Sequence, residues 1–313
     1  MPSVDDRGSK AMRAAALITA LVVPAAAGAE SPAGAALAHA GGDLIGELKV
    51  YQADKDDIFP EIARRFDLGY VELVAANPGI DPWVPGDKTR LLLPSAHLLP
   101  DAPRAGIVIN LAEQRLYYFP PSGATVASFP LGIGRLGWET PLGETRIVRK
   151  RENPTWIPPA SIRAERPNLP AVVPPGPWNP LGEHALNLGW ESFVIHGTNK
   201  PDGIGRRVSH GCIRLYPEDI AWLFGQVEVN TRVTVVDQSV KTGWSRGELY
   251  LEAHPSQSQS DELEASGRFT PAAVPELQWH VIRAAGEHAA RLDWSVINKV
   301  ARERLGIPVR VTR

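Results

Sequence analysis

The chain has 313 residues and a single cysteine, Cys212, so it cannot form an intramolecular disulfide. Cys212 lies in the run VSHGCIRL (208–215), and two histidines, His196 and His210, precede it. Either histidine could take the proton of the thiol and leave a thiolate, the form of sulfur that attacks carbonyl carbons. A buried, inert thiol is the commoner fate of a free cysteine, but histidine and serine neighbours are unfavourable in an apolar packing site. The sequence therefore predicts a reactive cysteine.

The first 29 residues have the features of an export signal. Lys10 and Arg13 give a positive start, residues 14–23 form a short apolar core, and AGA (27–29) offers small residues to a signal peptidase. We expect cleavage before Glu30. An uncleaved anchor is the alternative, but about ten apolar residues are too few to span a bilayer comfortably. One odd cysteine in an exported chain indicates an intermolecular bridge or a reactive thiol, and the flanking histidines favour the reactive thiol.

The charge balance and the motifs argue against several partners. Lys and Arg total 33 and Asp and Glu total 35, which gives a formal net charge of −2. No global basic field is present to attract nucleic acid or anionic lipid. The two histidines and the cysteine could bind zinc, but their segment offers no further acidic or cysteine ligand. The sequence shows no glycine loop that would cradle a phosphate before a helix. We therefore expect no nucleic acid, no metal and no cofactor.

A small α+β module is expected over residues 45–95. Residues 48–51 alternate like a strand, residues 57–66 and 70–76 have helical patterns, and residues 89–94 form a second strand. The second helix ends at NPG (77–79), which is a strong stop signal. The order is therefore β-α-α-β.

From residue 106 to residue 237 the pattern is that of a mostly-β domain. The expected strands are 107–111, 115–119, 125–129, 145–149, 192–196 and 232–236. The first two form a hairpin, and one helix is expected over 217–224, with a proline in its first turn. The prolines over 154–180 predict a long ordered loop. Short strands with one or two helices predict a sandwich or barrel-like fold.

A helical hairpin is expected at the C-terminal end. Residues 253–274 are polar and broken by Pro, Ser and Gln, and we interpret them as a linker. Residues 275–290 and 293–305 have helical patterns, and the second is ended by a glycine and a proline. Nothing in this hairpin indicates chemistry, so it packs on the catalytic domain or binds a partner.

A cysteine nucleophile needs a base and donors for the oxyanion of a tetrahedral intermediate. His196 follows an apolar run, so the end of a strand would hold it rigidly. His210 lies two residues before Cys212, and side chains at this spacing share a face in extended backbone. Gly211 permits a tight turn, and the backbone N–H groups near Gly211 and Cys212 are candidate oxyanion donors. These arguments leave open which histidine is the base.

The motifs HGTN (196–199), GIG (203–205) and VSHGCIRL (208–215) resemble the signature of the L,D-transpeptidases with a YkuD-type catalytic domain. TPLGE (140–144) and NPTWIPP (153–159) resemble further segments of that family. So does PPGPWNPLG (174–182), although Trp178 stands where the family usually has a small or acidic residue. The resemblance covers residues 106–237. It implies a YkuD-type β-sandwich or barrel with one or two helices.

The module over 45–95 resembles LysM modules, which bind glycans that contain N-acetylglucosamine. The matches are ANP (76–78) after the second helix and VPGD (84–87) before the last strand. The family usually has Gly-Asp-Thr-Leu before the first helix, whereas this chain has KDDI (55–58). The resemblances imply a signal peptide at 1–29, a LysM-like module at 45–95, a catalytic domain at 104–238 and a linker with helices at 239–313.

The L,D-transpeptidase resemblance implies roles for individual residues. Cys212 would be the nucleophile and His196 the base, with His210 the alternative base. Ser209, His210 and Gly211 would shape the site. Arg214 would hold a stem carboxylate or form a structural salt bridge. By their positions in the family's motifs, Thr198 and Trp156 would contact the substrate. The alternative for Trp156 and Trp178 is that they stiffen the proline-rich loop.

The same resemblance implies a periplasmic enzyme of the Gram-negative type that acts on peptidoglycan stem peptides. Cys212 would attack the L-centre carbonyl of meso-diaminopimelate in a tetrapeptide stem and release D-Ala. The acceptor would be an amine of another stem, which gives a 3→3 cross-link, or a lysine of an outer-membrane lipoprotein. The thiolate would also accept carbapenems. The alternatives are a cysteine hydrolase that uses water as acceptor, and a wall-binding protein without catalytic activity.

Overall fold

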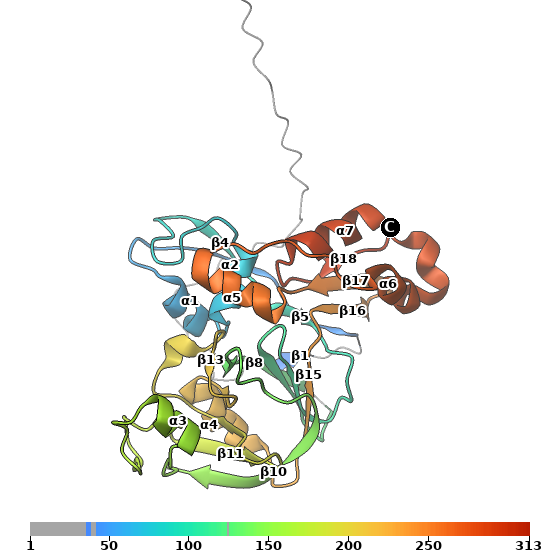
Figure 1. The fold of residues 1–313 in the computed structure, drawn as a ribbon. Helices are drawn as coiled ribbons and strands as arrows, with labels where there is room; N and C mark the ends of the chain where they lie inside the picture. The colour runs from blue at the N-terminus through green and yellow to red at the C-terminus, as the bar shows by residue number, and fades with distance from the viewer. Residues whose placement is uncertain (1–35, 39–41, 124) are drawn as a thin grey trace, which may run out of the picture.

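The computed structural model describes residues 36–38, 42–123 and 125–313, and the expected signal peptide lies outside these ranges. Figure 1 shows three regions: a small module in blue and cyan, a large β-rich region in green and yellow, and a C-terminal region in orange and red. Within the described residues, no helix is long and apolar enough to cross a membrane.

A curled sheet of nine strands forms the β-rich region, as the predicted fold class requires. Its strands in spatial order are β1 (Ala36–Ala38), β8 (Thr125–Pro130), β7 (Arg115–Phe119), β6 (Gly106–Asn110), β15 (Arg232–Val236), β10 (Gly143–Glu152), β11 (His184–Leu188), β12 (Val194–His196) and β14 (Ile213–Arg214). Neighbours are antiparallel except in two pairs, β6 with β15 and β12 with β14, which are parallel. The predicted hairpin is β6–β7, where Ile107, Ile109 and Leu116 are fully buried.

Short elements complete this region and carry the segments around Cys212. These are β9 (Ile133–Gly134), α3 (Ala160–Glu165), the 3-10 turn η1 (Pro201–Gly203), β13 (Arg207–Ser209) and α4 (Pro217–Gln226). Helix α4 begins with a proline, has Glu218 and Asp219 in its first turn, and buries Ile220 and Leu223 against the core. Acidic side chains at a helix N-terminus are favourable because they face the positive end of its dipole. The helix predicted over 217–224 is therefore present and two residues longer.

The small module has the predicted element order. It contains β3 (Lys49–Gln52), α1 (Phe59–Arg65), α2 (Tyr70–Ala76) and β4 (Arg90–Leu93), and β3 pairs with β4. Its helices bury apolar side chains such as Ile62 and Leu73 in one cluster. A second pair, β2 (Leu44–Gly46) with β5 (Ala96–Leu98), joins the module to the rest of the chain.

The C-terminal region contains a sheet that the sequence prediction missed. Strands β16 (Val240–Ser245), β17 (Glu248–Ala253) and β18 (Val309–Arg310) form it, and α6 (Leu277–Ala285), η2 (Gly286–Arg291) and α7 (Trp294–Glu303) pack on it. The two helices were predicted. The β16–β17 hairpin turns at Arg246 and Gly247, which both have positive φ. Two positive φ values suit the twist of a tight hairpin, but an arginine gives little sign of such a turn.

The linker predicted over 253–274 is wrong, because residues 257–266 form the helix α5 (Gln257–Ser266). Ser256 caps its first turn: the Ser256 hydroxyl accepts from the Gln259 N–H, and the Gln259 side chain accepts from the Ser256 N–H. Such a capping box is a local start signal. The polar composition of the segment concealed it, since Leu263 is the one α5 side chain in the apolar cluster of the small module. Figure 1 shows α5 in orange beside α2.

The small module is docked on the strip of chain that precedes Cys212. The Tyr70 N–H donates to the Ile204 carbonyl at 3.3 Å, and the Val71 N–H donates to the Gly205 carbonyl at 3.1 Å. A Cβ atom on Gly205 would lie 2.1 Å from the Tyr70 nitrogen, so only glycine permits this approach. The Arg206 guanidinium lies 3.6 Å from the centre of the Tyr70 ring. The module and the β-rich region therefore share main-chain hydrogen bonds.

A buried network of charged side chains joins the regions. Lys241 Nζ lies 2.6 Å from Glu113 Oε2, 3.0 Å from Glu252 Oε1 and 2.6 Å from the Leu98 carbonyl oxygen. His254 Nε2 lies 2.6 Å from Glu252 Oε1. All four charged or titratable side chains of this network are buried. One ammonium thus connects the β6–β7 turn, β5 and the C-terminal hairpin.

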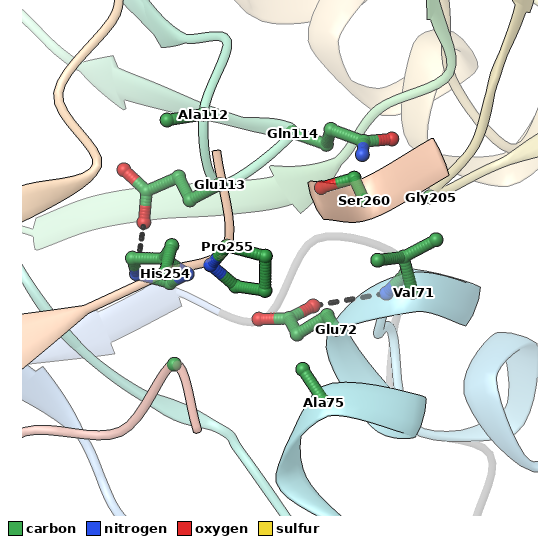
Figure 2. Close-up of a pocket in the computed structure, with 12 residues that line it drawn as sticks. Val71, Glu72, Ala75, Ala112, Glu113, Gln114, Gly205, His254, Pro255 and Ser260 are labelled. Carbon is green, nitrogen blue, oxygen red and sulfur yellow. Dashed lines mark hydrogen bonds and ion pairs between the residues drawn. The ribbon is translucent and has the colours of Figure 1, made fainter. Parts of the chain in front are cut away.

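The space beside this network is almost filled. Figure 2 shows Glu113 and His254 on one side of a cavity and Glu72 of α2 on the other, with Gln114 and Ser260 near its edge. The cavity has a volume of about 10 Å³, which is room for roughly one water molecule. The three regions therefore meet in a closely packed junction.

Replacement of Lys241 by methionine should lower the free energy of unfolding by about 3–5 kcal/mol, because it leaves two buried carboxylates without their cation. Urea unfolding followed by circular dichroism measures the loss. Lys55→Met, at an exposed lysine of the small module, is the control and should cost less than about 0.5 kcal/mol. A loss of under about 1 kcal/mol for Lys241→Met would show that the network does not hold the junction.

Two carboxyl groups meet at the interface between the small module and α4. Burial raises the pKa of Asp67 to about 6, and burial and Asp67 raise the pKa of Asp219 well above its ordinary value. Asp67 Oδ1 and Asp219 Oδ2 are buried and have no hydrogen-bond partner among the described residues. A shared proton between the two groups satisfies both oxygens.

A carboxyl whose pKa is raised on folding stabilises the folded state at low pH and loses that contribution as pH rises through the folded pKa. For Asp67 this window runs from 3.8 to about 6. Asp219→Asn supplies a permanent N–H donor to Asp67, so it should raise the free energy of unfolding at pH 7 and change it much less at pH 4. Urea unfolding at both pH values measures this. Equal effects at the two pH values, or a match to the exposed control Asp202→Asn, would contradict the shared proton.

Candidate active site

The parallel pairing of β12 with β14 brings the two sequence motifs together. Ile195 lies opposite Ile213, and His196 lies opposite Arg214. Because side chains alternate between the faces of a strand, His196 and Arg214 share one face. The same alternation, continued one residue beyond the start of β14, would direct Cys212 to that face. The charge of Arg214 acts on the pKa of both His196 and Cys212, which agrees with this placement.

A tight turn presents the cysteine at the start of β14. Gly211 has φ of +94°, and a Cβ atom there would lie 3.1 Å from the Phe193 ring, so glycine is required. The Thr140 hydroxyl donates to the Gly211 carbonyl at 2.9 Å, and the fully buried Ser209 hydroxyl donates to the Cys212 carbonyl at 2.5 Å. These two bonds fix the orientation of the peptide groups around the sulfur.

The N–H groups of Gly211 and Cys212 make no hydrogen bond to another residue in the described part of the chain. The Gly211 carbonyl is turned toward Thr140, so the Cys212 N–H in the same peptide plane is turned the opposite way. Orientated N–H groups without a partner beside a nucleophile are suited to bind a developing oxyanion. Sequence reasoning had named these donors but not Thr140, which holds them from 71 residues away.

His196 is buried and is held as a neutral base. Its Nδ1 lies 2.5 Å from the Gly197 carbonyl oxygen, so Nδ1 carries the proton and Nε2 is left as an acceptor. Burial, together with the nearby Arg214 charge, lowers the pKa of His196 to about 3. At neutral pH the imidazole is therefore uncharged, with the lone pair of Nε2 unprotonated.

Cys212 is held as a neutral thiol. Its side chain is partly reachable by solvent, but the dense packing around the sulfur raises the thiol pKa above the ordinary value of 9.0. The backbone of Val194 and the charge of Arg214 oppose this shift without reversing it. The thiol donates to the Ser192 carbonyl at 3.7 Å. The resting pair is thus thiol and imidazole rather than thiolate and imidazolium.

His210 has different surroundings from those of His196. Its Nε2 lies 2.9 Å from Glu165 Oε2 and 3.2 Å from Arg135 Nη2. The Trp138 ring packs against the imidazole, with 4.9 Å between the ring centroids. This Nε2 is engaged by a carboxylate, which weakens the alternative in which His210 is the base. Neither Arg135 nor Glu165 was identified from the sequence, because both lie far from the cysteine motif along the chain.

The three residues predicted to contact substrate differ in their positions. Arg214 is half-buried, its Nε has no hydrogen-bond partner, and no ion pair to it occurs among the described residues. Thr198 is buried, and its hydroxyl accepts from the Lys200 N–H at 2.9 Å, which closes the turn after His196. Trp156 is half-buried in the proline-rich segment, where its backbone pairs with that of Val173. Of the three, Arg214 is the one with a buried side-chain nitrogen that has no hydrogen-bond partner among the described residues.

The proline-rich segment is ordered by an asparagine. The buried Asn179 side chain donates to the Pro154 carbonyl at 2.7 Å and accepts from the Leu181 N–H at 2.9 Å. Trp178 is 86% exposed, so it does not stiffen the segment by packing.

A metal-like cluster occurs in the described residues away from Cys212. Ligand atoms of His97, Glu113 and Glu252 lie within 4.8 Å of one another. Lys241 Nζ lies at hydrogen-bond distance from both carboxylates and supplies the positive charge that a cation would otherwise bring. Burial lowers the pKa of His97 well below its ordinary value. We therefore interpret this cluster as part of the structural network around Lys241.

Comparisons with known proteins point to one family. The model of the YkuD family, described as an L,D-transpeptidase catalytic domain, matches residues 104–235. The chain is 41% identical to the probable L,D-transpeptidase YcfS of Escherichia coli (strain K12), with 88% of each chain covered. It is 38% identical to the probable L,D-transpeptidase ErfK/SrfK of Salmonella typhimurium, with 87% of this chain and 89% of that protein covered.

Solved structures include the catalytic domain of an Enterococcus faecium L,D-transpeptidase acylated by ertapenem. That domain is 25% identical to this chain, the match covers 42% of this chain and 95% of the domain, and the TM-score is 0.33.

The neutral thiol makes a prediction for the free protein. The rate of Cys212 alkylation by iodoacetamide should keep rising above pH 9, because burial raises the thiol pKa. Arg214→Gln should move the midpoint higher still, since the guanidinium favours the thiolate. Intact-protein mass spectrometry reads the rate without ambiguity, because Cys212 is the only thiol. A rate that levels off below pH 7 would indicate a thiolate–imidazolium pair instead.

Proposed function

The chain belongs to the L,D-transpeptidases with a YkuD-type catalytic domain, a family of peptidoglycan-modifying enzymes, and we propose that it works through Cys212 and His196. The observation that supports this proposal most strongly is the parallel pairing of β12 with β14, which sets His196 opposite Arg214 and therefore close in the sheet to the turn that carries Cys212. The proposed acyl donor is a tetrapeptide stem that ends in D-Ala.

In the first half-reaction, the Cys212 sulfur attacks the L-centre carbonyl of meso-diaminopimelate while the thiol proton passes to His196 Nε2. The two transfers are coupled because both groups are neutral at rest. The oxyanion accepts hydrogen bonds from the Gly211 and Cys212 N–H groups. The intermediate then collapses: the peptide bond breaks, His196 returns the proton to the leaving nitrogen, D-Ala departs and a thioester remains on Cys212.

In the second half-reaction, an acceptor amine attacks the thioester and gives its proton to His196, which returns it to the departing sulfur. An amine of a second diaminopimelate would form a 3→3 cross-link, and a lysine of an outer-membrane lipoprotein would attach that protein to the wall. Water in place of the amine would make the same thioester the intermediate of an L,D-carboxypeptidase. The acceptor therefore decides which of these products forms, without any change in the residues that do the chemistry.

We also propose that residues 45–95 bind the glycan strands of peptidoglycan. The β-α-α-β order of β3, α1, α2 and β4 supports a LysM-like module, and Trp83 on its surface is 56% exposed. An exposed indole offers a flat apolar face of the kind that packs against a sugar ring. Because the module is docked on residues 204–206, a bound glycan would lie at a fixed place relative to Cys212.

The proposed location is the periplasm, after removal of residues 1–29 as a signal peptide. This location agrees with the substrate, since peptidoglycan lies outside the inner membrane. It also agrees with a chain whose single cysteine is the proposed nucleophile rather than a partner in a disulfide.

The test is incubation of the purified protein with disaccharide-tetrapeptide, followed by intact-protein and product mass spectrometry. We expect release of D-Ala, an acyl adduct on Cys212 and 3→3 dimers, and we expect carbapenems to acylate the same residue. Tripeptide without dimers would indicate that water or a missing lipoprotein is the acceptor. An unmodified protein and no D-Ala would favour a wall-binding protein without catalysis.

Matched histidine variants separate the two candidate bases in the same assay. His196→Gln should slow acylation by about 10²–10⁴-fold, the usual contribution of a general base. At saturating peptide, His210→Gln should slow acylation less than His196→Gln does, because the His210 Nε2 is engaged by Glu165 and Arg135. Cys212→Ala should abolish acylation while binding of the protein to purified peptidoglycan is retained. A larger loss in His210→Gln than in His196→Gln would reverse the assignment of the base.

A further inference from the structure

Helix α3 is held on the active-site region by one side chain. It lies in the proline-rich segment, and none of its residues is buried. Among the described residues, the side-chain hydrogen bonds that tie α3 to other elements are all made by Glu165, to Arg135 and His210. A six-residue helix with no buried face has little apolar packing to keep it in place. Its position therefore depends on this ionic contact.

The partners of Glu165 belong to the wall of the active site. Both Glu165 oxygens lie 2.7 Å from Arg135 Nη2, and Oε2 lies 2.9 Å from His210 Nε2. His210 is two residues before Cys212, and the Arg135 N–H donates to the Ser209 carbonyl at 3.0 Å. The edge of Trp138 fixes the His210 ring. Arg135 and His210 are thus anchored to the turn that carries Cys212, whereas the Glu165 carboxylate comes from the weakly packed helix α3.

Arg135 and His210 can bind any carboxylate, not only that of Glu165. A guanidinium and an imidazole that converge on one carboxylate make charge-assisted hydrogen bonds. These bonds hold the pKa of Glu165 below its ordinary value, so the group is ionised at neutral pH. Further cations lie near the site: Arg214, whose Nε has no partner, and Arg166, whose charge acts on Arg214. The peptide stem of peptidoglycan is itself an anion with several carboxylates.

We propose that Arg135 and His210 form a carboxylate-binding subsite for the donor stem peptide, which Glu165 occupies in the free protein and leaves when the peptide binds. This inference rests on the proposed function and adds a recognition site to it. Exchange of one carboxylate for another keeps the charge of the subsite constant. It also frees α3 to move away from the cysteine, because the contact that holds it passes to the peptide.

A carboxylate-binding subsite and a purely structural role for Glu165 predict different dependence of peptide affinity on the peptide's carboxylates. If Glu165 only fastens α3, the affinity for the peptide is independent of any one peptide carboxylate at this place. If the subsite binds the peptide, one peptide carboxylate and the Arg135 side chain make the same contact. The losses of affinity on removing each of them are then not additive. A double-mutant cycle between protein and ligand measures this coupling.

The experiment measures the dissociation constant of disaccharide-tetrapeptide by calorimetry on Cys212→Ala protein, which cannot turn the ligand over. The ligands are the free acid and forms amidated at one carboxylate at a time. The protein variants, all in the Cys212→Ala background, are Arg135→Gln and Glu165→Gln. The matched control is Arg163→Gln, an exposed arginine on the same helix.

Glu165→Gln should bind the free acid several-fold more tightly, because the internal competitor is gone. Arg135→Gln should bind it about tenfold more weakly, the usual loss for a charge-assisted hydrogen bond. Amidation at the recognised carboxylate should cost about the same factor in the parent and clearly less in Arg135→Gln, where only His210 remains to bind the carboxylate. Arg163→Gln should bind as the parent does.

Two results would overturn the subsite. In the first, amidation at any single carboxylate leaves the affinity of the parent unchanged. In the second, amidation weakens binding by the same factor in the parent and in Arg135→Gln. The amidated ligands test the parent directly, so the conclusion does not depend on a variant that folds poorly. D-Ala release by the unmodified protein, measured in parallel, keeps this outcome separate from failure of the proposed function. Release with no amidation effect rejects the subsite alone, and no release rejects the transpeptidase chemistry.

Discussion

The buried Lys241 ammonium is the contact on which the arrangement of the regions depends. It joins the β6–β7 turn through Glu113, the C-terminal hairpin through Glu252, and β5 through the Leu98 carbonyl. Burial of charged groups is costly, and apolar side chains of the same size could often replace them without loss of stability. What a charged network adds is selectivity, because a shifted register would leave a charge unpaired. We interpret the network as the feature that sets how the C-terminal sheet meets the catalytic sheet.

The site combines the positive charge of Arg214 with two neutral groups, the Cys212 thiol and the His196 imidazole. Arg214 lies opposite His196 in the strand register, and its charge disfavours an imidazolium while it favours a thiolate. Burial acts on both groups in the direction of the neutral form. A neutral thiol is less open to oxidation than a thiolate, which would be an advantage in the proposed periplasmic location. In the proposed mechanism the thiolate must therefore be generated during the attack itself.

The sequence predicted those parts of the structure that are encoded locally. The β6–β7 hairpin, α4 and the β-α-α-β order each follow from periodicity and from residues at their own ends. The β16–β17 hairpin was missed because its turn at Arg246 and Gly247 gives little local signal. Helix α5 was missed because its apolar content is low and the cluster that takes Leu263 is distant along the chain. In the site, Cys212 and His196 stand in recognisable motifs. Thr140 lies in the TPLGE motif (140–144) and Glu165 lies in none, and only the folded chain shows that they contact residues 211 and 210.

The docking of the small module on residues 204–206 has a consequence for how such proteins can evolve. The Tyr70 and Val71 N–H groups pair with carbonyls only a few residues before Cys212, and the contact admits no side chain at Gly205. A module exchanged for one from another protein would leave these backbone groups without partners. Recombination therefore has to carry the module and the catalytic motif together. We therefore expect the two parts to be inherited together, although they look like separate domains in the sequence.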